Sequence, residues 1–502
     1  MSNILGWKGS RTLPRLVFAG VFALALAGCD TDEIVAVEDP AQLLPDAAET
    51  PAAVPALVQG AVRQFEGGYS GLGDDAFVSS SGVITDEFAW GDSFTTRFAA
   101  DRRTLQAPVL TNISDVAFSR LHQSRIQILR TLAAIDRFED DLDDPDAMRA
   151  TLKTTDAYVR VTLSEGWCGA VPFSTVPAEG PIDPSTIVEG PGQSVVQMNE
   201  AAVALFDEAL AIDPASELAL VGKARALLNL GRYAEAEATV ADVTDTFVHH
   251  IEHSTNTSVQ NNSLSSLIDN GRYSLANLEG GTTATGTALR PDNNTAATNA
   301  TAEGLNFRSA QDPRVPYQNN GGCFTGSIQC WKYNNYPMFT ADVPLASGVE
   351  ARLVEAEAAL QRGDFVTMLE RLNYLRARTA SLLPLLYPEQ DQVFPAPTAG
   401  APSLAPLTDP GIGLLTPAEQ FAARRALVFR ERAFWMFGTG HRQGDLRRLV
   451  RVYGLPQAQV WPTGPYFRAA GSNYGTDVAY PVPFNEENNT QFVRAQCVTS
   501  AA

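Results

Sequence analysis

Apolar residues recur at the spacing of one helix face near the C-terminal end of the chain. Their steps of three or four residues match an amphipathic α-helix; the positions are Ala422, Ala426, Phe429, Ala433 and Phe437. Residues 416–419 (Thr-Pro-Ala-Glu) carry an N-cap threonine, a first-turn proline and a capping-box glutamate. Gly438 and Gly440 end this helix, and the chain from His441 is predicted to begin another.

The same reasoning predicts helices elsewhere along the chain. One begins near Pro51 and ends at the glycines 67–68, and others cover about 114–137 and 151–166. The acidic run 138–146 between two of them is interpreted as solvated surface. Residues 69–110 are predicted to be loop-like, and the polar stretch 254–320 is predicted to be a long insertion.

An internal repeat supplies the strongest organisational signal. Residues 222–243 and 354–375 superimpose at a constant offset that aligns Gly231 with Gly363 and Tyr233 with Phe365. Each unit reads as a helix, a glycine turn, an aromatic residue and a second helix, the spacing of a tetratricopeptide hairpin. Since neither unit buries its apolar face alone, helices from 114–166 and 416–450 are expected to pack on them. The predicted fold class is therefore all-α (mainly α), built on tetratricopeptide-like hairpins with a loop-rich, irregular face.

Charged residues are interleaved with the aromatic ones in 416–450. A half-desolvated guanidinium without a partner is costly. We therefore interpret five residues as a structural ion-pair hub rather than a catalytic site: Glu431, Arg432, Arg442, Asp445 and Arg448.

The N-terminus carries a targeting pattern. Lys8, Arg11 and Arg15 precede an apolar run that ends in Leu-Ala-Gly before Cys29. This pattern predicts a lipoprotein signal peptide at 1–28, lipidation of Cys29, an acidic tether at 29–50 and a folded domain at 51–502. The alternative is an ordinary secretory signal with an incidental cysteine.

Several short segments resemble the SusD/RagB-like family of outer-membrane nutrient-binding lipoproteins. They include Glu431-Arg432, Gly-His-Arg at 440–442, Asp-Leu-Arg-Arg at 445–448, Asp-Pro-Arg at 312–314 and Pro-Val-Pro-Phe-Asn-Glu at 481–486. Trp435 and Thr439 replace acids that are usual in the pattern. The resemblance covers the chain from the N-terminal cysteine to about residue 490, and it rests on the order and spacing of these segments.

The resemblance implies a protein lipid-anchored at the outer membrane and exposed at the surface. Such a protein would bind oligosaccharide or another nutrient and hand it to a SusC-like TonB-dependent transporter. The alternative is a tetratricopeptide-type scaffold lipoprotein of an envelope complex. With a net charge of −20 and no basic patch, nucleic acid is not an expected partner.

The catalytic and metal-binding patterns in the sequence are incomplete, which argues against an enzyme. Gly-Tyr-Ser-Gly-Leu at 68–72 lacks the last glycine of a nucleophile elbow. His249 and His253 are spaced for a shared metal, but no further ligand lies at a suitable spacing. We therefore expect no catalytic residue, no metal site and no cofactor.

Four cysteines remain after Cys29, and they allow three connectivities. Cys323 and Cys330 flank a six-residue segment and form a plausible looped clip, whereas Cys168 and Cys497 lie far from it in sequence. Zinc ligation is disfavoured because no CxxC is present.

An aromatic loop supplies the candidate ligand contacts. Trp331, Tyr333 and Tyr336 stand among asparagine, proline and lysine residues, which predicts that they are exposed. Aromatic faces stack on sugar rings, so these three residues are candidate ligand contacts, with core packing as the alternative. Core packing is favoured for Phe324 and Phe339. Trp90 is a second candidate, because the family tends to place ligand aromatics in N-terminal loops and mid-chain. A third cluster is assigned to packing or a partner surface: Trp461, Tyr466, Phe467 and Tyr474.

Overall fold

The fold is taken from a computed structural model, which describes residues 50–72, 75–105, 112–180, 182–282, 287–288, 303–326, 328–390, 404–469 and 471–502. The chain from Pro51 to Ala502 forms one compact unit. The predicted signal peptide, Cys29 and all of the tether except its last residue lie outside the described residues, so the lipobox stays a prediction. None of the described helices is long and apolar enough to cross a membrane.

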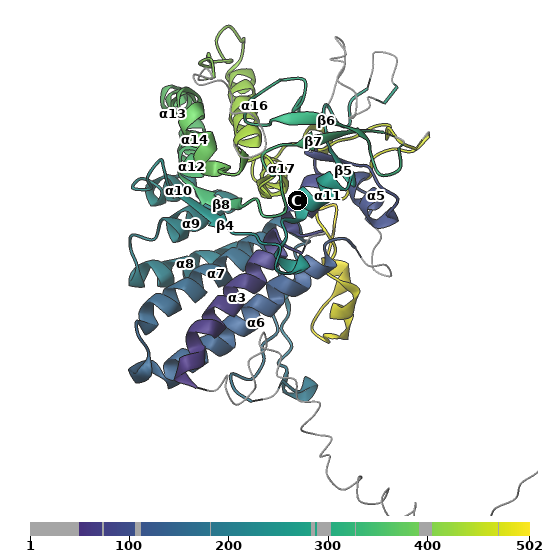
Figure 1. Cartoon of the computed structure of the whole chain (residues 1–502). Coiled ribbons are helices and arrows are strands. Elements are labelled where there is room, and N and C mark those ends of the chain that lie inside the picture. Colours follow the sequence, from purple (N-terminus) through teal and green to yellow (C-terminus); the bar gives the residue numbers. More distant parts are fainter. Residues whose placement is uncertain are drawn as a thin grey trace, which may run out of the picture. The chain divides into compact units, whose positions relative to one another are not determined.

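The fold is mainly α-helical, as predicted (Figure 1). The longer helices are α3 (Val54–Tyr69), α6 (Asp115–Arg137), α7 (Pro145–Gly166), α8 (Val195–Ile212), α9 (Glu217–Asn229), α12 (Gly348–Gln361), α13 (Phe365–Ala377), α16 (Pro417–Trp435) and α17 (His441–Arg451). Shorter helices are α4 (Phe77–Ile84), α5 (Thr95–Asp101), α10 (Tyr233–Thr239), α11 (Ser263–Asp269) and α14 (Thr379–Leu386).

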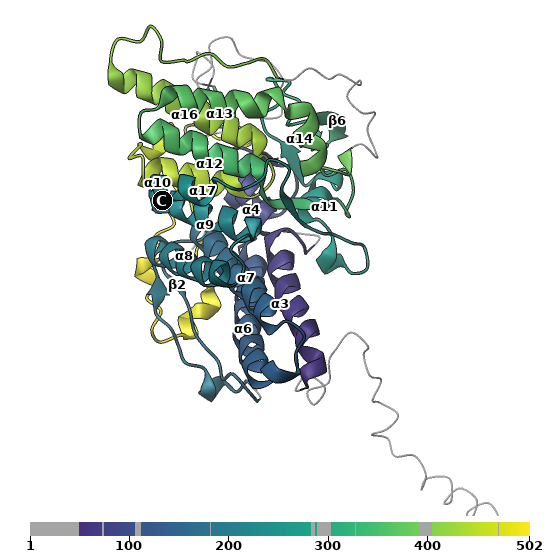
Figure 2. The ribbon, with the colours of Figure 1, turned by 90° about the vertical axis from the view of Figure 1, so that its left-hand side faces the viewer.

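Neighbouring helices pack in pairs along much of this unit (Figure 2). Helix α3 lies against α6, and α7 lies against α8, which in turn packs on α9. Gly222 of α9 shows how close these helices come. A β-carbon there would lie 2.4 Å from the Phe206 ring of α8 and 2.7 Å from the Tyr158 ring of α7. Glycine is therefore required at this crossing, as the repeat pattern indicates.

Both predicted tetratricopeptide-like hairpins are confirmed as α9–α10 and α12–α13. Gly231 and Gly363 occupy their turns with φ angles of 74° and 78°, a left-handed conformation that a side chain would strain. Helix α7 packs on α9 and α16 packs on α12. The helices expected to cover the two units therefore do so.

The strands are short and form two-stranded antiparallel sheets. They are β1 (Phe88–Trp90) with β5 (Tyr273–Leu275), β2 (Val171–Pro172) with β3 (Gly192–Gln193), β4 (Val248–Ile251) with β8 (Val343–Ser347), and β6 (Tyr317–Gly322) with β7 (Gln329–Tyr333).

Two segments predicted to be loops contain regular structure, which corrects that interpretation. Residues 69–110 contain α4, β1 and α5, and residues 254–320 contain α11, β5 and the first part of β6. Helix α4 is buried on every side, so its sequence lacks the polar alternation that marks an amphipathic helix.

The predicted ion-pair hub is confirmed, with partners drawn from distant segments. Arg432 donates two hydrogen bonds of 2.9 Å to Asp445, and Arg448 donates to both Asp445 and Glu357. Burial alone would raise the pKa of Asp445, but the attraction of Arg432 and Arg448 lowers it below its usual range. Helices α12, α16 and α17 are joined through these charges.

The two remaining hub residues pair outside α16 and α17. Glu431 accepts from Arg314, of the Asp-Pro-Arg segment, at 2.7 Å, and from Arg376 at 2.8 Å. Arg442 forms a bidentate pair with Asp86. The hub therefore ties the helical hairpins to the segments that carry the strands.

The cysteine pairing is also resolved. Cys323 is bonded to Cys330, which confirms the looped clip, and Cys168 is bonded to Cys497. The second bond joins the end of α7 to the C-terminal segment.

Candidate ligand-binding site

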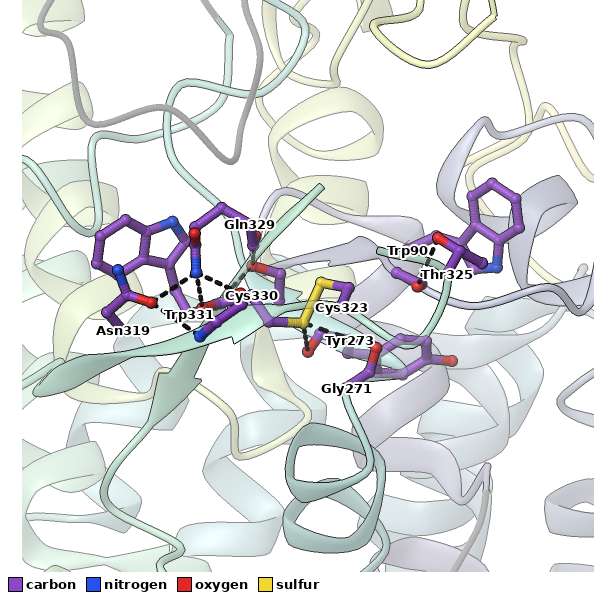
Figure 3. The surroundings of a disulfide bond; sticks show 12 residues. Trp90, Gly271, Tyr273, Asn319, Cys323, Thr325, Gln329, Cys330 and Trp331 are labelled. Carbon is purple, nitrogen blue, oxygen red and sulfur yellow. Dashed lines mark hydrogen bonds between the residues drawn. A yellow bond between two sulfur atoms is a disulfide. The ribbon is translucent and has the colours of Figure 1, made fainter. Parts of the chain in front are cut away.

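The β6–β7 hairpin carries the first candidate residue, Trp331, at its edge. Asn319 of β6 lies opposite Trp331 of β7, and β6 is exposed along almost its whole length. Ser274 of β5 holds β7 in place through two hydrogen bonds. Its hydroxyl accepts from the Trp331 backbone N–H at 3.0 Å and donates to the Gln329 carbonyl at 3.2 Å. The Cys323–Cys330 disulfide closes the hairpin (Figure 3).

Tyr333 and Tyr336 do not reach the surface, and their prediction as exposed ligand contacts is wrong. Both rings are fully buried. The Tyr333 hydroxyl donates to the Phe437 carbonyl at 3.0 Å, and the Tyr336 hydroxyl donates to the Gly438 carbonyl at 3.1 Å. These tyrosines hold the turn between α16 and α17, because each satisfies a buried carbonyl that the end of α16 leaves unpaired.

Trp331 is half-buried at the side of the hairpin. The Tyr317 ring meets it edge-on at 5.7 Å between centroids, and the Arg308 guanidinium lies 4.7 Å from its ring centroid. Gln329 and Asn319 are hydrogen-bonded beside it at 2.6 Å. An aromatic ring bordered by side-chain amides suits a sugar hydroxyl pattern, so Trp331 stays a predicted ligand contact.

Trp90 is also half-buried, and it lies on the other side of the disulfide from Trp331 (Figure 3). Its indole N–H donates to Asp92 at 2.6 Å, and the Arg468 guanidinium lies 3.9 Å from its ring centroid. The structure therefore does not join the two tryptophans in one cluster. Trp90 likewise stays a predicted contact.

Two phenylalanines beside Trp90 are far more exposed than either tryptophan. Phe94 is 52% exposed and Phe324 is 56% exposed. The assignment of Phe324 to the core is therefore a second error, and Phe94 was missed altogether. The residues around Phe94 and Phe324 follow no apolar periodicity, so the sequence does not indicate whether either ring is exposed. Their exposure depends on how the loops pack in the folded protein. We call Trp90, Phe94 and Phe324 the aromatic patch.

Backbone hydrogen bonds fix the segments that form the aromatic patch. The Gly91 N–H donates to the Arg272 carbonyl at 2.7 Å, and the Phe324 N–H donates to the Gly271 carbonyl at 3.0 Å. A β-carbon at Gly91 would lie 2.8 Å from the Cys323 sulfur, so glycine allows the disulfide loop to approach this closely. The patch is thus built into the fold.

Arginines surround the aromatic patch, and the nearby acids are buried beneath it. The Arg272 guanidinium lies 3.8 Å from the Phe324 ring centroid and 5.4 Å from that of Phe94. Asp92 is fully buried and accepts from Arg97 at 2.6 Å. Cation–π contacts of this kind hold a guanidinium against a ring.

A buried pair of carboxyl groups anchors the same loops. Asp101 and Glu279 influence each other's titration, and burial raises the pKa of both groups. Asp101 also accepts from the Tyr466 hydroxyl at 2.5 Å and from the Trp90 backbone N–H at 3.1 Å. Tyr466, Tyr474 and Trp461 are buried, which confirms packing as the role of these three residues.

A groove of about 630 Å³ lies in the helical part of the unit, where α3, α7, α8 and α9 meet β4. Phe65 and Tyr158 contribute to its apolar floor, and Glu66, Asp146 and Asp213 contribute acids to its lining. None of the predicted ligand contacts lines it. Among the described residues no group of three potential metal ligands was found.

Comparisons with known proteins agree with this architecture. A family model for the tetratricopeptide repeat matches residues 197–253, which include the first hairpin. No curated protein matches the chain.

Solved structures match almost the whole chain. A SusD superfamily protein from Bacteroides vulgatus is 13% identical with a TM-score of 0.56, covering 88% of this chain and 97% of that one. A laminarin-binding SusD-like protein is 16% identical with a TM-score of 0.54, covering 88% and 98%. NanU of B. fragilis is 13% identical with a TM-score of 0.55, covering 91% and 99%. The chain therefore has the fold of the SusD superfamily.

Proposed function

We propose that this protein binds an oligosaccharide or another nutrient and delivers it to a SusC-like TonB-dependent outer-membrane transporter. The aromatic patch and Trp331 are the proposed contact residues. The single observation that carries the proposal is the pair of exposed phenylalanines beside Trp90 on a fold that a laminarin-binding protein shares. Exposed aromatic faces fixed by a rigid scaffold suit the stacking of sugar rings.

The proposed location is the outer membrane, with a lipid on Cys29 as the anchor. The basic residues, the short apolar run and the Leu-Ala-Gly-Cys sequence support this part of the proposal. A Cys29→Ser variant should leave the membrane fraction and appear in the soluble fraction. Retention of that variant in membranes would contradict lipidation at Cys29.

The proposed activity is binding without catalysis. The aromatic patch is bordered by arginines, and Asp92 and Asp101, which hydrogen-bond to Trp90, are fully buried. General acid or base work requires a group within reach of the bound substrate. A buried carboxylate that already accepts several hydrogen bonds does not meet that requirement.

The scaffold alternative has one observation in its favour, the tetratricopeptide match at residues 197–253. Repeats of this kind present concave surfaces to protein partners, and the groove beside α9 would supply one. In that case the exposed aromatic residues would bind no sugar.

Ligand titration separates the two proposals. The full-length protein, purified in detergent, would be tested against neutral and acidic glycans by calorimetry. Trp331→Ala and Phe324→Ala should each weaken binding by about 1–3 kcal/mol without lowering the melting temperature. The exposed Phe484, remote in sequence from the patch, supplies a matched control as Phe484→Ala. Failure of every glycan to bind would favour the scaffold.

A further inference from the structure

We propose that the aromatic patch selects a sugar that bears an anionic group, a carboxylate or a sulfate ester, and that Arg272 binds this group. The inference rests on the proposed function, because it concerns the ligand of the same site. An anionic sugar is a narrower ligand class than the fold alone indicates.

Arg272 has hydrogen-bonding capacity that the protein does not use. Arg272 forms an ion pair with Asp92, whose carboxylate oxygen lies 3.6 Å from Nη1, and Nη1 is buried without a hydrogen-bond partner among the residues that the structure describes. The side chain is 23% exposed. A guanidinium offers five N–H donors in a planar fork that fits a carboxylate or a sulfate. Arg272 is therefore the available anion-binding group of the patch.

Arg97, which lies close to Arg272, is an arginine whose hydrogen bonds stabilise the fold. Its guanidinium is buried and donates to Asp75 at 2.8 Å and to Asp92 at 2.6 Å. Arg97 thus satisfies most of the charge of Asp92, which leaves Arg272 with only the long contact to that carboxylate. The difference between the two arginines separates a fold-stabilising role from a role toward a ligand.

The position of Arg272 is fixed before any ligand arrives. Its backbone N–H donates to the Leu267 carbonyl at 2.8 Å, and its own carbonyl accepts from Gly91 at 2.7 Å. The side chain rests on Phe324. Because the guanidinium is already held against this ring, little conformational entropy is lost when an anion binds.

The ring contacts and the charge fit a single type of ligand. Phe94 and Phe324 keep about half of their surface exposed for the C–H face of a sugar ring, and the Arg272 guanidinium contacts both rings, with Arg97 also 4.9 Å from the Phe94 centroid. Arg468, which covers Trp90, donates to the Trp90 carbonyl at 2.5 Å and to the Thr325 hydroxyl at 3.2 Å, so Arg272 is the cation proposed to bind the anion. The acids close to the patch, chiefly Asp92, are buried. On a chain with a net charge of −20, this is a local cationic surface.

The test uses ligand pairs that differ only in charge. Oligogalacturonate and its methyl ester compare a carboxylate with a neutral ester, and dextran sulfate and dextran compare a sulfate with a neutral hydroxyl. Dissociation constants of the full-length protein in detergent would be measured by calorimetry at low and moderate salt. The acidic member of at least one pair should bind at least about tenfold more tightly, and the preference should shrink as salt screens the charge.

Variants of two arginines assign the preference to Arg272. Arg272→Gln should bind both members of a pair equally, and Arg272→Lys, which keeps the charge but loses the fork, should retain only part of the preference. Arg378 supplies the control, because its guanidinium also lies over an aromatic ring, that of Tyr374 at 3.5 Å, on the α13–α14 segment. Arg378→Gln should keep the full preference.

Each outcome decides between the proposals. A preference for carboxylate alone or for sulfate alone would identify which anion the patch accepts. Equal binding of acidic and neutral glycans, or a preference that survives Arg272→Gln, would overturn the inference and leave the proposed function intact. No binding of any of the four ligands would overturn this inference, and no binding across the wider glycan panel would overturn the proposed function as well.

Discussion

Arg442 and Asp86 form a bidentate ion pair although they are 356 residues apart in the sequence. The Arg442 Nε and Nη2 atoms donate to the two carboxylate oxygens at 2.7 and 2.8 Å, and both side chains are buried. Asp86 also accepts from the Leu305 backbone N–H at 2.8 Å. This carboxylate therefore joins α17 to the turn that precedes β1, the strand that carries Trp90.

Removal of Arg442 should destabilise the fold strongly. Arg442→Ala leaves the Asp86 charge buried without its partner, which costs about 3–5 kcal/mol of unfolding free energy. Urea unfolding followed by circular dichroism measures this value. Arg137→Ala supplies the control, because its pair with Glu179 at 3.0 Å is largely exposed and should contribute less than about 1 kcal/mol. Similar losses for both variants would contradict the assignment of Arg442 to a buried hub.

The buried carboxyl of Glu87 should make the protein less stable as pH rises. Burial raises the pKa of this carboxyl from 4.5 to about 8 in the folded protein, although the Gly438 backbone N–H donates to it at 3.0 Å. The unfolded chain releases this proton near pH 4.5, whereas the folded protein keeps it until about pH 8. The folded state thus binds more protons across this window, and the contribution of Glu87 to stability falls by roughly 3–4 kcal/mol from pH 5 to pH 8.

Replacing Glu87 with glutamine should remove the pH dependence that this carboxyl causes. Glu87→Gln keeps an oxygen that accepts from Gly438 and does not titrate, so its unfolding free energy should vary less between pH 5 and pH 8. Chemical unfolding at several pH values measures the difference. Glu370→Gln, at an exposed position of α13, should leave the slope of the parent protein unchanged. If Glu87→Gln and the parent protein showed the same pH dependence, the Glu87 carboxyl would not be protonated in the folded protein as expected.

Tyr336 should behave as a core residue. Tyr336→Ala opens a cavity and leaves the Gly438 carbonyl without its donor, so we expect a loss of about 3–5 kcal/mol in unfolding free energy. Thermal unfolding compared with Trp331→Ala, at a half-buried position, measures the contrast. An unchanged melting temperature for Tyr336→Ala would return this tyrosine to the ligand contacts.

The two disulfides should differ in their effect on stability. Cys323 and Cys330 are 7 residues apart, and Cys168 and Cys497 are 329 apart. In the chain-entropy model the short loop is worth about 2–3 kcal/mol and the long one about 5–6 kcal/mol. Denaturant unfolding of Cys323→Ser/Cys330→Ser and Cys168→Ser/Cys497→Ser tests this order. The opposite order would show that strain or residual structure outweighs loop closure.

The sequence predicted those parts of the fold that depend on local periodicity. The helix cap at Thr416, the glycine turns at Gly231 and Gly363 and the charged hub around Asp445 are all present. Each has a local signature, because caps, left-handed turns and closely packed charges restrict the residue types nearby. The partners of the hub, such as Asp86 and Glu357, carry no such signature, since they are brought together only by tertiary packing.

The candidate site was predicted less well, for a physical reason. Tyr333 appeared exposed because Asn334 and Asn335 follow it, yet both asparagines are buried, and Asn335 donates to the Tyr333 hydroxyl at 2.7 Å and to the Arg314 carbonyl at 3.1 Å. Polar neighbours indicate a surface only when they are not satisfied inside the protein. The exposure of Phe324 and the unused donors of Arg272 are properties of the folded loops.

We propose that this protein acts together with a TonB-dependent barrel. Gentle solubilisation of the outer membrane, isolation of this protein and identification of its companions by mass spectrometry test this partnership. A TonB-dependent transporter should be recovered in stoichiometric amount. Recovery of envelope-assembly proteins without such a barrel would contradict this proposal and favour the scaffold.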